Sequence, residues 1–188
     1  MAQTYDVADW SSLPVPQDDG ATDHLTGLSM PSVSLSSTSG GTVDLSALRG
    51  LTIVYIYPKT GQPGTDMPDG WDMIPGARGC TPQSCSFRDH MADLTALGVD
   101  QLFGLSTQDT DYQVELKNRT HLPFDILSDS QLALTDALSL PTFEAAGERL
   151  IKRMSLAIRD GEIINVIYPI FPPDQNAARV IDWLKSNA

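Results

Sequence analysis

The chain has 188 residues, of which 41% are hydrophobic, so it holds enough apolar material for one packed domain and is not disordered throughout. Its two cysteines, Cys80 and Cys85, are too few for a disulfide-stapled scaffold and exclude a four-cysteine zinc module. The formal net charge of −12 argues against nucleic acid as a partner, because such a surface repels a phosphate backbone.

The N-terminal part of the chain is acidic and polar. The first 48 residues contain six aspartates and no lysine or arginine. We therefore predict an acidic extension over residues 1–23, which has no need to be ordered, and one compact domain over residues 24–188. No basic region followed by an apolar run opens the sequence, and no apolar stretch approaches the roughly 18 residues of a membrane span. These features predict a soluble, cytoplasmic protein with no membrane partner.

The first half of the domain predicts a strand, a helix and a second strand. Residues 51–58 (LTIVYIYP) form a nearly unbroken β-branched and aromatic run, which is typical of a central strand buried on both faces. After a long loop, apolar residues recur at helical spacing from Phe87 to Leu97, and Gly98 supplies a helix stop. Residues 101–106 predict the next strand, and the helical crossover makes the two strands parallel.

The second half predicts further elements of both kinds. They are a helix at 111–117, a short strand at 125–127, a helical turn at 131–137, strands at 154–159 and 162–168, and a helix after residue 174 with Ala178, Ile181, Trp183 and Leu184 turned to the core. The dipeptide Asp160-Gly161 is a strong hairpin signal and makes the last two strands antiparallel. The order predicts an α/β fold, a mixed β-sheet flanked by helices, with an extended loop before the helix that begins near Cys80.

The segment 75–90 (PGARGCTPQSCSFRDH) carries the chemistry, because it joins the central strand to that helix at the carboxyl edge of the sheet. Pro82 marks the first helical turn, so Cys80 is predicted at the helix N-terminus, where unpaired amides and the helix dipole favour a thiolate. The dipole supplies only about 0.3 to 2 kcal/mol. A guanidinium is needed as well, and Arg78 and Arg153 are the candidates.

Cys85 lies five residues after Cys80. On one regular helix this spacing separates the residues by about 7.5 Å along the axis and about 140° around it, which places the two Cα atoms roughly 8 to 9 Å apart. A disulfide tolerates a Cα separation of at most about 7 Å. A Cys80–Cys85 bond therefore requires the first turns of the helix to unwind.

These residues resemble a known family. Residues 57–59 (YPK) and 79–89 (GCTPQSCSFRD) are similar to the active-site signature of peroxiredoxins of the peroxiredoxin Q, or bacterioferritin-comigratory-protein, type. Pro31, residues 42–45 (TVDL) and residues 153–156 (RMSL) resemble further parts of that family. The resemblance implies a thioredoxin-like fold and the reduction of hydrogen peroxide or organic hydroperoxides without metal or flavin.

The resemblance also implies residue roles. Cys80 would be the peroxidatic cysteine, which the peroxide oxidises to a sulfenic acid. Cys85 would be the resolving cysteine, which condenses with it to an intramolecular disulfide that a thioredoxin-type dithiol donor reduces. Arg153 would stabilise the thiolate and the charge that develops on the peroxide, and Gln83 would orient Arg153. The acidic surface that the composition predicts is compatible with a monomer or a homodimer alike.

Two features depart from the family pattern. The family's threonine or serine three residues before the peroxidatic cysteine is Ala77, and its proline four residues further back is Met73. The connection from Thr60 to Gly79 has 20 residues, where relatives have only a handful. Loops of this length are usually functional or disordered. We predict that the connection covers the Cys80 pocket or builds a subunit contact, with Trp71 and Ile74 as anchors, against the alternative of an insertion without a role.

Other interpretations remain open at this point. In one alternative, the two cysteines are inert small hydrophobes, and in another they form a metal site with His90. For Arg153, the alternative is a rim arginine paired with Glu148 or Asp160. A one-cysteine cycle makes Cys85 a spectator, and the loss of the hydroxyl at position 77 fits a thioredoxin-fold binding protein without peroxidase activity.

Overall fold

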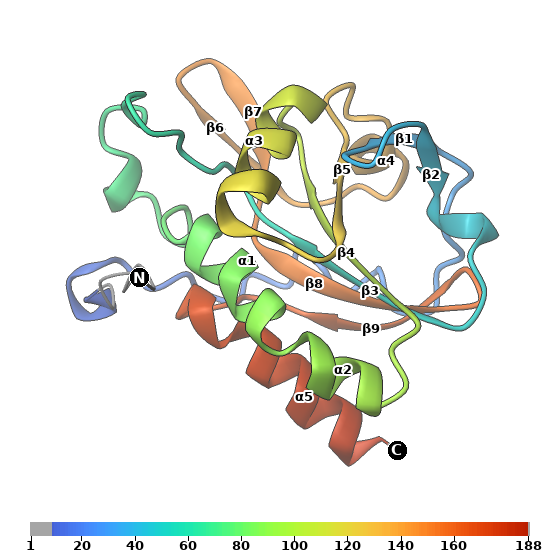
Figure 1. Cartoon of the computed structure of the whole chain (residues 1–188). Coiled ribbons are helices and arrows are strands. Elements are labelled where there is room, and N and C mark those ends of the chain that lie inside the picture. The colour runs from blue at the N-terminus through green and yellow to red at the C-terminus, as the bar shows by residue number, and fades with distance from the viewer. Residues whose placement is uncertain (1–8, 188) are drawn as a thin grey trace.

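The computed structural model describes residues 9–187, with a twisted sheet between layers of helices (Figure 1). The strands are β1 (Ser34–Ser37), β2 (Thr42–Asp44), β3 (Leu51–Ile56), β4 (Gln101–Ser106), β5 (Asp125–Ser128), β6 (Thr142–Ala145), β7 (Glu148–Ile151), β8 (Met154–Arg159) and β9 (Glu162–Ile167). The helices are α1 (Cys80–Asp89), α2 (Met91–Ala96), α3 (Thr110–Thr120), α4 (Ala133–Ala137) and α5 (Asn176–Ser186), and short 3-10 turns are η1 (Trp10–Ser12), η2 (Leu45–Ala47), η3 (Trp71–Met73) and η4 (Pro173–Gln175).

The main sheet has the strand order β2-β1-β5-β4-β3-β8-β9. Strands β3, β4 and β5 are parallel, whereas β8 pairs antiparallel with both β3 and β9. The predicted parallel crossover and the predicted C-terminal hairpin are therefore both confirmed, as is the mixed α/β fold. All six residues of β3 are buried, as expected for a central strand.

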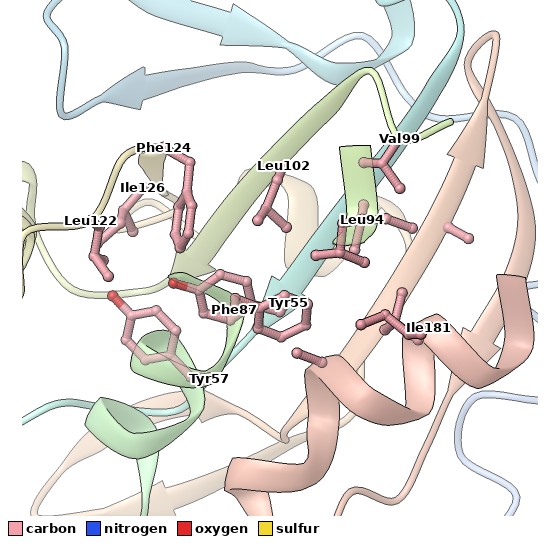
Figure 2. Packing of buried hydrophobic residues seen from close by; sticks show 14 of the residues in the cluster. Tyr55, Tyr57, Phe87, Leu94, Val99, Leu102, Leu122, Phe124, Ile126 and Ile181 are labelled. Carbon is pink, nitrogen blue, oxygen red and sulfur yellow. The ribbon is translucent and has the colours of Figure 1, made fainter. Parts of the chain in front are cut away.

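One side of the sheet carries the aromatic part of the core. Tyr55 of β3 stacks on Phe87 of α1, with ring centroids 4.4 Å apart, and meets Phe124 edge-on (Figure 2). Residues of α1, α2, α3 and α5 pack against this face, whereas α4 and the segment around Leu25 and Met30 cover the other. The Tyr55–Phe87 contact anchors α1 to the central strand.

The structure corrects two expectations and adds one hairpin. The predicted helix ending at Gly98 consists of two helices, because His90 (φ −103°, ψ 9°) leaves the helical conformation between α1 and α2. In α5 the buried residues include Ala177 and Val180, and Ala178 is only half-buried, because the helix begins at Asn176 after a 3-10 turn. The hairpin β6–β7 was not predicted. It pairs antiparallel apart from the main sheet.

No helix within residues 9–187 is long and apolar enough to cross a membrane.

Gly104 tests how tightly the central strands pack. A Cβ built on Gly104 would lie 2.8 Å from Cζ of the buried Tyr55 ring on the neighbouring strand. We expect Gly104→Ala to lower the free energy of unfolding by about 1–3 kcal/mol, the usual cost of overpacking a core. Urea denaturation measures the change. Gly61→Ala is the matched control, because its Cβ would meet only the flexible Met67 side chain, and an equal loss in both variants would contradict the explanation.

Candidate active site

Cys80 is the first residue of α1, and Gly79 precedes it as the N-cap. Gly79 has φ 104°, a conformation that side chains other than glycine rarely adopt. A Cβ at this position would lie 2.2 Å from Cγ of Pro173 and 2.8 Å from Cη2 of Trp10. Glycine is therefore required for Cys80 to sit at the helix start, where sequence analysis placed it.

Arg153 reaches the thiol from the residue before β8. Its Nη2 lies 3.2 Å from Cys80 Sγ, and both residues are only 3% exposed. The same guanidinium donates to the carbonyl oxygens of Gly76, Ala77 and Arg78 at 3.1–3.2 Å. These contacts hold the arginine and the last residues before α1 in one arrangement.

The buried guanidinium has no carboxylate partner among residues 9–187. The interpretation of Arg153 as a rim arginine is wrong, because Glu148 pairs with Lys59 at 2.7 Å and Asp160 accepts from the backbone of Gly50. The contact that Arg153 makes with an ionisable side chain is therefore the one with the Cys80 thiol, within residues 9–187.

Arg78, the other candidate, does not bring its side chain to the thiol. Its guanidinium pairs with Asp72 at 2.6 Å, and both side chains are about half exposed. Only its backbone carbonyl accepts a hydrogen bond from Arg153. Of the two predicted arginines, the structure brings Arg153 alone to Cys80.

A row of buried polar groups lies behind Arg153. Gln83 accepts from Arg153 Nη1 and donates to Asn176 Oδ1 at 2.8 Å. Ser155 donates to the same oxygen at 2.8 Å. The contact of Gln83 with Arg153 agrees with its predicted position, whereas Asn176 and Ser155 were missed, because an asparagine at a helix start reads as an ordinary cap.

Cys85 lies on the same helix and is 8% exposed, and neither cysteine forms a disulfide. The helix is continuous between Cys80 and Cys85, so the estimate of roughly 8 to 9 Å between their Cα atoms applies. Burial raises the pKa of the Cys85 thiol, and Asp89 adds to this, although Arg88 acts against it. Cys85 is therefore neutral at pH 7.

The raised pKa predicts a slow reaction of Cys85 with alkylating agents. In a Cys80→Ser variant, the rate of alkylation by iodoacetamide should keep rising with pH beyond about 8.5, the usual pKa of a thiol, because the thiolate is the reacting form. Mass spectrometry of quenched samples measures the rate. Urea-unfolded protein is the control. A folded-state profile that levels off at the unfolded pKa would contradict the burial argument.

The Cys80 pocket is a cavity of about 490 Å³ whose wall includes Cys80. Its lining combines Cys80, Thr81 and Pro82 of α1, Lys59 after β3 and Trp10 from the N-terminal segment with seven residues of the 60–79 connection: Thr60, Gly61, Met67, Trp71, Asp72, Arg78 and Gly79. The long connection thus forms one wall of this pocket. Trp10 was not predicted to contribute, because no local pattern marks it.

The connection is anchored by Trp71, as predicted. Trp71 is 4% exposed and packs with Ala77 and Leu150, and Phe143 of the β6–β7 hairpin lies 6.1 Å away between ring centroids. Ile74 packs against the same cluster. Ala77, at the position of the family's hydroxyl residue, is buried in this cluster and offers only its carbonyl oxygen to the site.

The structure does not assemble the alternative metal site. His90 lies at the other end of α1 from Cys80, with Nδ1 2.9 Å from the carbonyl oxygen of Ser86. Among residues 9–187, no three histidine, cysteine, aspartate or glutamate side chains gather in a way that could hold a metal ion. Arg88 and Asp89 form an ion pair at 2.8 Å.

A buried cysteine at a helix start and a buried arginine, on a sheet of this topology, define a thiol redox protein with a thioredoxin-like fold. The Redoxin family model matches residues 25–181. The chain is 30% identical over 163 residues to peroxiredoxin Bcp of Escherichia coli. The aligned region covers 84% of this chain and 94% of that relative. It is 32% identical to a putative chloroplastic peroxiredoxin Q of Oryza sativa, over 85% of this chain and 66% of that protein.

Solved structures share the fold. Peroxidoxin BcpB of Mycobacterium tuberculosis aligns with a TM-score of 0.69 at 22% identity, over 88% of this chain and 99% of its own. Xanthomonas campestris peroxiredoxin Q aligns with a TM-score of 0.64 at 19% identity, over 93% of this chain and 96% of its own. The chain belongs to the peroxiredoxins of the peroxiredoxin Q or bacterioferritin-comigratory-protein type. Peroxiredoxins are thiol-dependent peroxidases, so this protein is an oxidoreductase.

Proposed function

We propose that Cys80 is the peroxidatic cysteine and that it reduces hydrogen peroxide or an organic hydroperoxide. The Cys80 thiolate attacks one peroxide oxygen, so that an S–O bond forms while the O–O bond breaks. The sulfur is oxidised to a sulfenic acid, and the other oxygen leaves as hydroxide or alkoxide, which becomes water or an alcohol by taking up one proton, equal to the one that the thiol released on ionisation. The observation that carries this proposal is the buried Arg153 guanidinium, which lies 3.2 Å from Cys80 Sγ and has no carboxylate partner within residues 9–187.

Arg153 acts on both charged species of this step. It neutralises the thiolate before the reaction and stabilises the negative charge that develops on the leaving oxygen. Nη1 donates to Gln83 and Nη2 to backbone carbonyls, so the guanidinium is already oriented before the peroxide binds. Gln83 and Asn176 are positioning residues, since they act through Arg153.

Cys85 is the proposed resolving cysteine. Its thiol attacks the Cys80 sulfenic acid, an S–S bond forms, and the oxygen leaves as water. Because the two residues lie on one intact helix, α1 has to open before the sulfur atoms meet. A thioredoxin-type dithiol donor then exchanges with the disulfide and becomes oxidised itself. Such a donor acts in a reducing compartment, and we propose a cytoplasmic location.

A one-cysteine cycle is the second candidate. It is favoured by the burial of Cys85 and by the continuous helix between the two thiols. In that cycle an external thiol attacks the Cys80 sulfenic acid directly, and α1 stays closed.

Thiol counting after one equivalent of hydrogen peroxide tests both schemes. The proposal expects the wild type to lose both thiols, the Cys85→Ser variant to stop at a sulfenic acid that dimedone traps, and the Cys80→Ser control to keep its remaining thiol. Retained steady-state turnover of Cys85→Ser with thioredoxin would contradict the intramolecular scheme. A wild type that keeps both thiols would instead identify a protein without peroxidase activity.

A further inference from the structure

The N-terminal segment brings a tryptophan to the reactive thiol. Trp10 precedes the part of the chain that the family model matches, which begins at residue 25. Its Nε1 donates to Asp174 Oδ2 at 3.0 Å, and its ring meets Phe171 edge-on with centroids 6.5 Å apart. The six-membered ring lies against Gly79, the residue before Cys80. The segment runs beside the first turns of α1 and α5 (Figure 1).

A second contact holds the other end of this segment. Lys152 and Tyr168 both donate to the Asp19 carboxylate, at 2.7 and 2.8 Å. These hydrogen bonds lower the pKa of Asp19 to about 2, and the bond from Lys152 has the largest effect. The carboxylate therefore stays ionised at every pH at which a thiol reacts. Trp10 is thus tied to the domain through Asp174 on one side and through Asp19 further along.

The size of the Cys80 pocket exceeds what hydrogen peroxide needs. The pocket measures about 490 Å³, whereas a space that holds one water molecule needs about 10–15 Å³ by the same measure. Sites for small organic ligands have volumes of about 300–1,000 Å³. The pocket therefore has room for an organic group beside the two peroxide oxygens.

The pocket has an apolar side next to polar groups that include the hydroxyls of Thr60 and Thr81. Trp10, Met67, Trp71 and Pro82 supply apolar surface around Cys80. The two cations of its lining already have partners, because Lys59 pairs with Glu148 at 2.7 Å and Arg78 pairs with Asp72 at 2.6 Å. Both lining cations are therefore already paired when a substrate arrives, and neither favours a substrate that carries a carboxylate.

We propose that Trp10 is a specificity-determining residue, whose indole forms the wall against which the organic group of an apolar hydroperoxide packs. This inference rests on the proposed function of Cys80. The peroxide oxygens occupy the end of the pocket at Cys80, whose Sγ lies 3.2 Å from Arg153 Nη2, and the organic group extends toward Trp10. After the O–O bond breaks, the alcohol that carries this group leaves through the same opening.

The test compares two peroxides in wild type and in Trp10→Ala. Competition kinetics give the second-order rate constant of Cys80 oxidation by cumene hydroperoxide and by hydrogen peroxide. Trp10→Ala removes an aromatic contact with the organic group, so it should slow the cumene hydroperoxide reaction by about 2- to 13-fold, which corresponds to about 0.5–1.5 kcal/mol. The hydrogen peroxide reaction should stay within about twofold, because that substrate does not reach the indole.

Two further variants separate substrate contact from structure. Trp10→Phe keeps an aromatic wall but loses the bond to Asp174, and it should retain most of the preference for cumene hydroperoxide. Trp183→Ala removes a half-buried tryptophan of α5 that lies outside the pocket, and it should leave the ratio of the two rates unchanged. The proposal would be overturned if Trp10→Ala left the ratio of the two rate constants unchanged, whether both reactions were slowed equally or neither was slowed.

A binding measurement decides the role of Trp10 without any peroxidase reaction. The alcohol product, 2-phenyl-2-propanol, should protect Cys80 from iodoacetamide in wild type and in Trp10→Phe, but several-fold less in Trp10→Ala. Equal protection of all three proteins would overturn the inference. A wild-type Cys80 that neither peroxide oxidises would instead overturn the proposed function, and the protection assay would still report on Trp10.

Discussion

Replacing Arg153 by methionine is expected to slow the oxidation of Cys80 by hydrogen peroxide by about 10²–10³-fold, the usual effect of removing a preorganised donor to a developing charge. The guanidinium is the buried cation that contacts Cys80 Sγ, at 3.2 Å. Methionine has a similar length but offers neither the charge nor the hydrogen bonds. Competition kinetics against a second peroxidase measure the rate constant.

Arg149→Met is the matched control for this prediction. Arg149 lies four residues earlier, pairs with Asp136 at the surface and does not line the Cys80 pocket. We expect its rate constant to stay within about twofold of wild type, as is usual for exposed ion pairs. Circular dichroism checks that both variants fold. An Arg153→Met protein that folds and reacts at the wild-type rate would show that the arginine has no part in the chemistry.

Oxidation to the disulfide is expected to unwind the first turns of α1. The two Cα atoms lie roughly 8 to 9 Å apart on the intact helix, beyond the roughly 7 Å that a disulfide spans. Amide hydrogen exchange in residues 83–86 should accelerate by on the order of 100-fold or more, because these amides then lose their helical partners, of which the first is the Gly79 carbonyl. The amides of α3 are the internal control. Equal protection of residues 81–90 in reduced and oxidised protein would contradict the prediction.

Unwinding is expected to stop before Phe87. That side chain is fully buried and stacks on Tyr55 of the central strand, so freeing it would expose a large aromatic surface (Figure 2). Peroxide-treated Cys85→Ser protein forms no intramolecular disulfide, and its α1 amides should exchange at the reduced rate. Rapid exchange in that variant would assign the unwinding to the sulfenic acid itself.

The elements that the sequence predicts well are those with a strong local pattern. The unbroken apolar run of β3 and the Asp160-Gly161 turn between β8 and β9 are visible in a few residues. The hairpin β6–β7 has no such signal, because its strands are only four residues long and half exposed. It turns at Ala146-Gly147, both with positive φ, whereas the dipeptides typical of such turns begin with asparagine, aspartate or glycine.

The candidate site shows the same division. The position of Cys80 at a helix start follows from local sequence, and so does the need for a guanidinium near it. The choice between Arg78 and Arg153 does not, because the nearer arginine in sequence turns to Asp72 while the one 73 residues away reaches the thiol. Trp10 and Asp174 are 164 residues apart, and no pattern in either segment announces their contact.

Arg153 contacts the segment before α1 through carbonyl oxygens, which every residue possesses. Its hydrogen bonds to Gly76, Ala77 and Arg78 set the path of the chain into Cys80 whatever side chains those residues carry. The route from Thr60 to Gly76 is therefore under little constraint in length from the site itself, and a 20-residue connection ends in the same place as a short one. In peroxiredoxins with this arginine arrangement, we expect the segment before the reactive helix to tolerate insertions. Such insertions can add residues to the pocket lining while the contacts of the thiol with the arginine stay the same.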